Sequence, residues 1–151
     1  MDITLHTEDA RWKGLRPTVR RAAEAALVAA LPKPSYAVAL TLLLTSDAAV
    51  QALNRDYRGK DKPTNVLSFP DGSEQDGTRY LGDIALAYET LAAEAAAQSK
   101  PLKAHLSHLT IHGVLHLLGY DHDVPRAARA MESLEVAILG SMGIANPYEM
   151  G

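Results

Sequence analysis

A leucine-rich run, LKAHLSHLTIHGVLHLL at residues 102–118, follows Pro101 and has the composition of a helix. Around such a helix the apolar side chains point in most directions, with Leu106, Ile111 and Leu117 on different sides. A helix that is apolar nearly all round is buried rather than laid on a surface. No apolar run in the chain reaches the roughly 18 residues of a membrane span. We therefore expect this helix at the centre of a soluble fold, with other elements packed around it.

The residues on either side of this run supply patterns for those elements. Alternating or β-branched runs predict strands, and alanine-rich runs predict helices. The expected strands are 3–7, 36–45, 64–69 and 80–87, and the other expected helices are 16–31, 47–57, 89–98 and 125–142. Pro17 suits the first turn of a helix, Ser46 and Asp47 suit a cap, and residues 71–78 form a polar turn-rich loop. The pattern predicts an α+β fold in which helices pack on a small mixed four-stranded sheet.

Composition limits the class of protein. The chain has 151 residues, 47% hydrophobic and 22% charged, with no internal repeat, which is ordinary for one globular domain spanning residues 1–151. Its net charge of −3 argues against nonspecific coating of nucleic acid, although a local basic patch can still face a local anion. The first residues, MDITLHTEDARW, lack the basic and apolar regions of a signal peptide, so we expect a cytoplasmic protein with no membrane partner.

Three histidines in and after the central helix have the spacing of a chelate. At about 100° per residue, His112 and His116 lie one turn apart, roughly 6 Å along the axis and nearly in line. Gly119 stands where the helix needs a residue tolerant of positive φ, which lets the chain turn and bring His122 back toward them. Because the chain has no cysteine, a metal must be held by imidazole, carboxylate or water. We predict one metal site on the helix and the following turn, formed by these three imidazoles.

Three neutral imidazoles suit Zn²⁺ and leave the fourth tetrahedral position open for water, whose pKa zinc can lower to about 7. An open position is typical of catalytic sites. Nickel or another divalent ion could also occupy the site, since affinity alone does not decide occupancy in a cell. The alternative is that the histidines are core residues, but each buried ring would then need its own polar partner.

Three neighbours of the ligands carry weaker expectations. His108, one turn before His112, could line the cleft or orient a ligand, whereas His105 is expected at the surface or in a structural role. Gly113 costs about 1 kcal/mol of helix propensity relative to alanine. It indicates either close approach of a neighbouring backbone or substrate, or ordinary tight packing.

The spacing from His112 to His122 is that of the metzincin metalloproteases, HExxHxxGxxH, except that position 113 is glycine. In those proteases the glutamate is the general base, so a peptidase of that class would lack its base here. Asp121 and Asp123 flank His122 and could act as a base or orient the ring. They could equally be turn and helix-cap residues, especially Asp123 shortly before Pro125.

A second segment favours phosphate chemistry. Arg55, Arg58, Lys60 and Lys62 form the densest basic cluster of an acidic chain. Arg58 is the best candidate for a bidentate phosphate contact, because a guanidinium matches the geometry of phosphate. Such a run is usually a solvated surface. Beside a metal site it favours phosphodiester cleavage, in which the metal and an arginine share the developing negative charge.

Four segments together resemble the YbeY family of bacterial endoribonucleases and rRNA maturation factors. They are YRGKDKPTNVLSFP (57–70), LGDIALA (81–87), HLTIHGVLHLLGYDH (108–122) and MESLE…ILG…NPY (131–148). The resemblance implies an α+β metalloprotein that holds a zinc-like metal at His112, His116 and His122. It also implies that Arg58 is a catalytic or RNA-phosphate contact and that Asp83 has a structural role near the site.

The same resemblance implies a substrate and partners. The substrate would be single-stranded RNA, cleaved in ribosomal RNA maturation, including the 3′ end of small-subunit rRNA, and in ribosome quality control. Ribosome or small-subunit proteins are expected partners, and DNA is not. Two other functions stay open at this point: a metallohydrolase of another substrate class, such as a peptidase, and a ribosome-associated factor in which the metal is structural.

Overall fold

The computed structural model describes residues 1–31 and 37–149. Its strands are β1 (Asp2–Thr7), β2 (Ala37–Thr45), β3 (Val66–Pro70), β4 (Glu74–Gln75) and β5 (Thr78–Ala87). Its helices are the short 3₁₀ helix η1 (Ala10–Trp12), α1 (Arg16–Ala30), α2 (Asp47–Arg58), α3 (Tyr88–Ala97), α4 (Leu102–Leu117) and α5 (Pro125–Ser141).

The strands form one mixed sheet in the order β1-β2-β5-β3, with β4 paired to β5. β1, β2 and β5 run parallel, whereas β3 and β4 run antiparallel to β5. Buried positions alternate along β2, as expected for a strand with one face in the core. In β3, Ser68 pairs with Ile84, and its hydroxyl donates to the backbone oxygen of Gly113. One face of β3 therefore contacts α4 directly.

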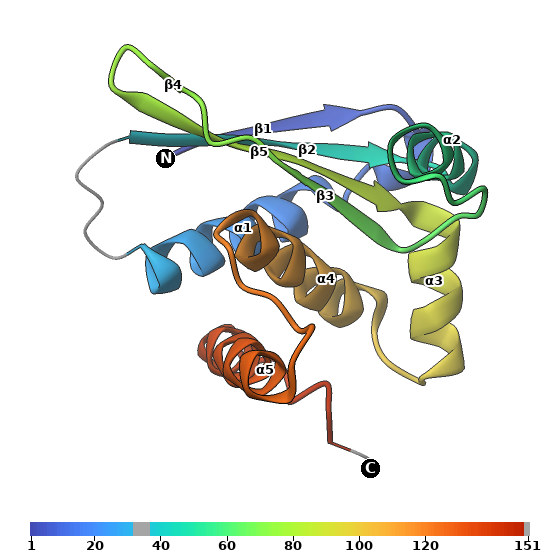
Figure 1. Ribbon diagram of the computed structural model, residues 1–151. Coiled ribbons are helices and arrows are strands. Elements are labelled where there is room, and N and C mark those ends of the chain that lie inside the picture. Colours follow the sequence, from blue (N-terminus) through green and yellow to red (C-terminus); the bar gives the residue numbers. More distant parts are fainter. Residues whose placement is uncertain (32–36, 150–151) are drawn as a thin grey trace.

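Helix α4 occupies the middle layer of the molecule. Figure 1 shows α1 and α4 under one face of the sheet and α5 beyond α4, whereas α2 lies over the opposite face at one end. Fully buried small residues on α1, Ala22, Ala23 and Ala26, let this helix approach its neighbours closely. On the other face, Val50 of α2 packs in a smaller cluster with Leu67 of β3. The all-round apolar pattern of α4 thus matches a helix covered on every side.

The structure confirms the α+β class, the mixed sheet and the central helix. Pro17 lies in the first turn of α1, and the Ser46 hydroxyl caps α2 by accepting from the N–H of Ala49. The expected strand 36–45 is β2, except that Tyr36 lies outside the described residues. No helix within residues 1–31 and 37–149 has the length and hydropathy of a transmembrane span.

The expected count of four strands is wrong by one. The loop at 71–78 contains β4, which forms a hairpin with β5 around Asp76 and Gly77. Both residues have positive φ, 53° and 79°, as a two-residue type I′ turn requires. An Asp-Gly pair is a strong hairpin signal, but β4 itself is only two residues long and its sequence carries no apolar alternation.

Candidate metal centre

The structure brings the three predicted histidines together. His112 and His116 project from α4, and His122 follows in the turn after the helix. One ring nitrogen from each lies within 4.8 Å of the other two, and the Nε2 atoms of His112 and His116 are 3.1 Å apart. Gly119 has a φ of +97°, so the turn that returns His122 has the left-handed residue that the sequence indicated.

The three side chains fit a divalent metal. Each ring offers one nitrogen lone pair when neutral, and three converging imidazoles are a donor set that zinc and similar ions prefer. Burial lowers the pKa of His116, and the neighbouring His112 and His122 lower it further. The neutral imidazole, which is the form that binds metals, is therefore favoured at this position.

A buried glutamate that sequence analysis did not single out supports the centre from behind. Glu135 of α5 is 0% exposed, and its Oε2 accepts a hydrogen bond from Nδ1 of His112 at 2.7 Å. Its Oε1 accepts from Nε2 of His108 at 2.8 Å and from the hydroxyl of Tyr148. A donor hydrogen on Nδ1 of His112 leaves Nε2 unprotonated and directed at His116. This carboxylate–imidazole pair is the usual device for orienting a metal-binding histidine.

The hydrogen bonds to Glu135 stabilise its ionised form. Burial on its own raises the pKa of this carboxyl, but the donors on His108, His112 and Tyr148 outweigh it and lower the pKa to about 2. Burial and the same carboxylate raise the pKa of Tyr148. The group is thus an ionised acceptor that can hold three donors at once. His108 contacts the carboxylate that orients His112, which agrees with one of the two roles expected for it.

Arg58 lies in the same cleft as the three histidines. The cleft has a volume of about 390 Å³, and its lining includes Asn65 and Ser68. Arg58 ends α2, where Gly59 caps the helix with a φ of 70° and sends the chain toward β3. Among the described residues, none makes a hydrogen bond or ion pair with the Arg58 side chain, which is exposed. Its guanidinium is available to an anion beside the histidines.

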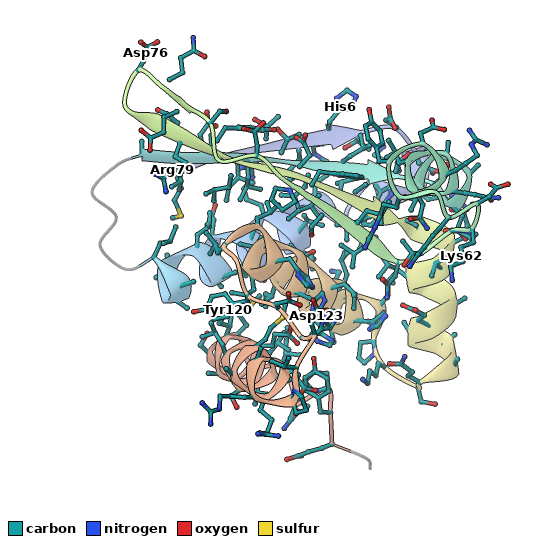
Figure 2. The ribbon with its side chains drawn as sticks, in the orientation of Figure 1. His6, Lys62, Asp76, Arg79, Tyr120 and Asp123 are labelled. Atoms are coloured by element: carbon teal, nitrogen blue, oxygen red, sulfur yellow. The ribbon has the colours of Figure 1, made fainter. Side chains whose placement is uncertain are left out.

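The other basic residues of this segment do not line the cleft. Arg55 pairs with Asp56 at 3.2 Å on an exposed surface. The backbone oxygen of Lys62 accepts from the side chain of Asn54, which fixes the loop after α2. Figure 2 shows Lys62 on the loop at the α2 end of the sheet. The basic cluster therefore divides into one cleft residue and several surface residues.

Several expectations about neighbouring residues are resolved by geometry. Gly113 is closely packed: a Cβ there would lie 3.0 Å from Cγ2 of Ile84, so tight packing explains the glycine. His105 is not at the surface but is buried, with Nε2 2.8 Å from Glu94. Asp83 is not near the site. Successive residues of a strand face opposite sides of the sheet. Ser68 faces α4, so Phe69 and its partner Asp83 face the α2 side, where both line a separate pocket of about 350 Å³.

Asp121 and Asp123 act in the turn in different ways. Oδ1 of Asp121 accepts from the N–H groups of His122 and Asp123, which lowers the pKa of its carboxyl. This is the turn role expected for an aspartate at such a position. Asp123 as a helix cap is wrong, since Val124 occupies the N-cap position of α5 with extended backbone.

Position 113, which holds the glutamate base in the metzincin proteases, packs against Ile84 here, and the structure leaves no space for a glutamate side chain.

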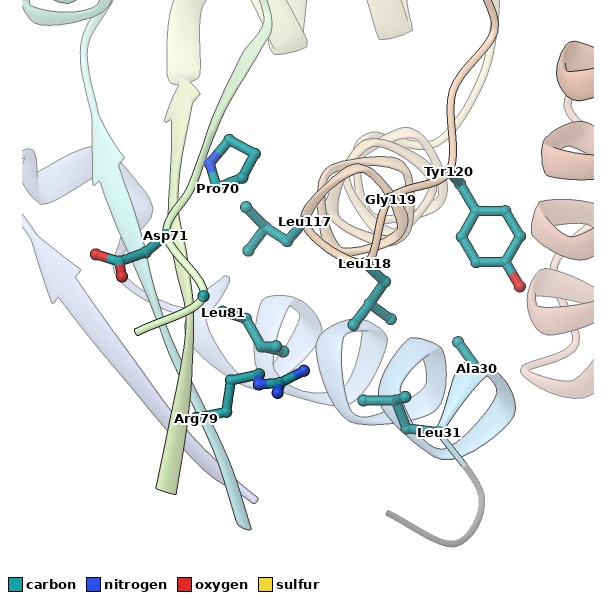
Figure 3. A pocket seen from close by; sticks show the side chains of 11 residues that line it. Ala30, Leu31, Pro70, Asp71, Arg79, Leu81, Leu117, Leu118, Gly119 and Tyr120 are labelled. Atoms are coloured by element: carbon teal, nitrogen blue, oxygen red, sulfur yellow. The ribbon is translucent and has the colours of Figure 1, made fainter. Parts of the chain in front are cut away.

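A larger cavity of about 480 Å³ lies at the C-terminal end of α4, beyond the turn at Gly119. Figure 3 shows Leu117, Leu118 and Arg79 around it, with Leu31 at the end of α1. Its lining contains neither Arg58 nor any of the three histidines. The cavity is therefore separate from the candidate metal centre.

Comparison with known proteins gives consistent matches. The model of the family described as Endoribonuclease YbeY matches residues 3–143. Endoribonuclease YbeY of Rhodospirillum rubrum is 51% identical over 91% of this chain and 76% of its own length. The protein of the same name from Sphingopyxis alaskensis is 48% identical over 92% of each chain. The solution structure of TM1509 from Thermotoga maritima has the same fold, with a TM-score of 0.60 at 23% identity over 98% of this chain and 99% of that one.

Proposed function

The chain belongs to the YbeY family of endoribonucleases, and from this premise we propose that it cleaves single-stranded RNA with the help of one divalent metal ion, Zn²⁺. We further propose that its substrate is ribosomal RNA, matured at sites that include the 3′ end of small-subunit rRNA, and that it serves ribosome quality control in the cytoplasm. One observation carries the proposal: three converging imidazoles line one cleft together with an arginine that has no partner among the described residues.

In this proposal His112, His116 and His122 hold the metal. A bound divalent ion would supply a Lewis acid that stabilises the negative charge developing on a phosphodiester. Glu135 holds the His112 ring through Nδ1, so that Nε2 faces the other two imidazoles. The buried position of α4 keeps His112 and His116 at a fixed separation.

Arg58 would bind the phosphate. Its planar guanidinium can donate two hydrogen bonds to two oxygens of one phosphate group, and it stays charged at any relevant pH. From the end of α2 it lies across the cleft from α4, so the scissile group can be held between arginine and imidazoles. We assign it the stabilisation of the charge that builds up during cleavage.

The proposal includes the ribosome or small-subunit proteins as partners. A chain with a net charge of −3 has little electrostatic attraction for RNA as a whole. Arg58 and the loop after it offer only a local positive region. Docking through a partner would supply the affinity that the chain itself lacks, and weak cleavage by the isolated protein is then expected.

The experiment that tests the assignment of Arg58 compares two arginines of α2. Metal-loaded Arg58→Ala should cleave end-labelled single-stranded RNA about a hundredfold more slowly than the unmodified chain, as is typical when a charge-stabilising donor is removed. Arg55→Ala, which removes an exposed arginine outside the cleft, is the matched control and should cleave normally. Equal rates for the two variants would remove Arg58 from the mechanism. Equal cleavage by chelated protein would point to a contaminating nuclease.

A further inference from the structure

A large pocket opens directly beside the metal centre and has no role in the mechanism above. Its volume is about 730 Å³, and it shares His112, Asn65 and Val66 with the cleft that contains Arg58. The two hollows therefore adjoin each other at these residues. When a phosphate of the RNA lies at Arg58 and the histidines, the larger pocket is within reach of a neighbouring nucleotide.

The two hollows differ in charge. The cleft at the histidines is lined by Arg58 and three imidazoles, and no carboxylate is among its described lining residues. The larger pocket is lined by Glu94 and Glu149, with Lys100 as its cation. A carboxylate repels phosphate but accepts hydrogen bonds from the edge of a base. The charges thus favour the phosphate on one side and a base on the other.

An exposed aromatic ring forms one wall of the pocket. Tyr148 is 44% exposed, yet its position is fixed: its hydroxyl donates to Glu135, and its ring packs edge-to-face with His108 at 5.3 Å. The adjoining backbone is also held, because Nζ of Lys100 donates to the oxygen of Pro147 at 2.9 Å. A fixed ring with an open side is the platform on which single-stranded nucleic acids stack their bases.

The polar wall of the pocket has a defined acceptor. Oε1 of Glu94 accepts from Asn65 at 3.0 Å and from His105 at 2.8 Å, and Oε2 accepts a longer bond of 3.2 Å from the same amide. A carboxylate oxygen has two lone pairs, so Oε2 retains an acceptor site. Adenine, cytosine and guanine carry an exocyclic amino group that can donate to it. Uracil has carbonyl oxygens at these positions, with its N3–H donor between them, so it offers the carboxylate no amino group.

We propose that this pocket is a base-binding subsite, which receives the nucleotide next to the scissile phosphate, stacks its base on Tyr148 and favours bases with an exocyclic amino group through Glu94. The assignment rests on the proposed function, since it names how that site holds its substrate. It adds a source of base preference that the metal and Arg58 cannot provide.

Binding of two labelled RNAs to metal-free protein tests the subsite without any cleavage. The bases of hexacytidylate and hexauridylate differ on this edge, because cytosine has a 4-amino donor and an N3 acceptor whereas uracil has an O4 acceptor and an N3–H donor. We expect the cytidylate to bind about fivefold more tightly, the effect of one hydrogen bond from the amino group to Glu94. Tyr148→Ala should weaken both by about tenfold through the loss of stacking. Tyr148→Phe keeps the ring for stacking but loses the donor to Glu135 that helps to fix it, so it should lose clearly less affinity than Tyr148→Ala. Fluorescence anisotropy measures the affinity of each protein for each RNA.

Glu94→Gln replaces the acceptor proposed for the amino group of the base, Oε2, with a donor. The amide oxygen can still accept from Asn65 and His105, which leaves its NH₂ group where Oε2 was. The preference for cytidylate should then vanish or reverse. Equal binding of the two RNAs by the unmodified chain, or an equal loss in Tyr148→Ala and Tyr148→Phe, overturns the subsite.

Cleavage by metal-loaded protein, measured in parallel, separates this proposal from the one on which it rests. Cleavage by a chain that binds both RNAs equally would sink the subsite alone. A preference for cytidylate that Glu94→Gln removes, in a chain that never cleaves, would support the subsite and sink the endoribonuclease mechanism.

Discussion

Glu135 has no exposure to solvent, and its two carboxylate oxygens are shared among three donors, on His108, His112 and Tyr148. An ionised carboxylate can be buried without a large penalty only when such donors satisfy it. The arrangement therefore couples two requirements: the donors keep Glu135 charged, and Glu135 keeps the His112 ring in one tautomer and one orientation.

Glu135→Gln should weaken metal binding by about ten- to a hundredfold, the usual effect of removing a partner that orients a metal-binding histidine. The amide has one oxygen, so it can accept from His112 or from the other donors but not from all of them. Competition with a chromophoric chelator measures the affinity. Glu132→Gln, one turn earlier on α5, is the matched control; if both variants bind metal like the unmodified chain, the orienting role is wrong.

The sequence predicted the three histidines of the site but not Glu135 or Tyr148, and the reason is physical. His112, His116 and His122 lie in one helix and its following turn, so local helical geometry alone predicts that they converge. Glu135 reaches His112 only because α5 packs against α4, and Tyr148 reaches Glu135 from the segment that follows α5. Sequence spacing carries no information about either packing arrangement.

Among the elements, α4 carries most of the constraints, because it contacts the sheet, α1, α3 and α5. Its buried residues fall on most sides, and His112 and His116 occupy half-buried positions that open to the cleft. At Gly113 α4 packs closely on β5, because a Cβ at this position would lie 3.0 Å from Cγ2 of Ile84. The sequence predicted the burial of α4 from composition, but it could not decide what approached Gly113, since the partner is a strand almost thirty positions earlier in the chain.

Gly113→Ala should destabilise the fold by about 1–3 kcal/mol, because overpacking against Ile84 outweighs the gain in helix propensity. Gly140→Ala is the matched control in α5. Nothing in the described part of the chain lies within 4 Å of a Cβ at that position outside the helix itself, so this change should stabilise by about 1 kcal/mol. Urea unfolding measures both. Stabilisation by both substitutions would contradict the close approach of α4 to β5.

On the scale of the whole molecule, the proposed metal centre would join α4 to the turn that leads into α5. An ion held by His112, His116 and His122 would bind the folded chain and not the unfolded one, so it should stabilise the fold by mass action. The folding of α4 does not require the ion, because the apolar side chains of this helix are buried against its neighbours.

Chelation should therefore lower the melting temperature without unfolding the protein at room temperature. At a free metal concentration a hundredfold above Kd the stabilisation is about 2.7 kcal/mol, which corresponds to roughly 5–10 °C for a chain of this size. Calorimetry of loaded and chelated protein measures the shift, with circular dichroism to check the fold. Complete unfolding on chelation would instead identify the metal as structural.

The most direct test of a three-histidine metal centre that drives RNA cleavage is a titration. Zn²⁺ is added in steps to chelated protein while the cleavage of end-labelled single-stranded RNA is followed, and His116→Ala is titrated alongside. We expect the rate to rise linearly and to level off at one ion per chain, with no rise in the variant. A rate that does not depend on added metal, or that rises equally in His116→Ala, would contradict the account.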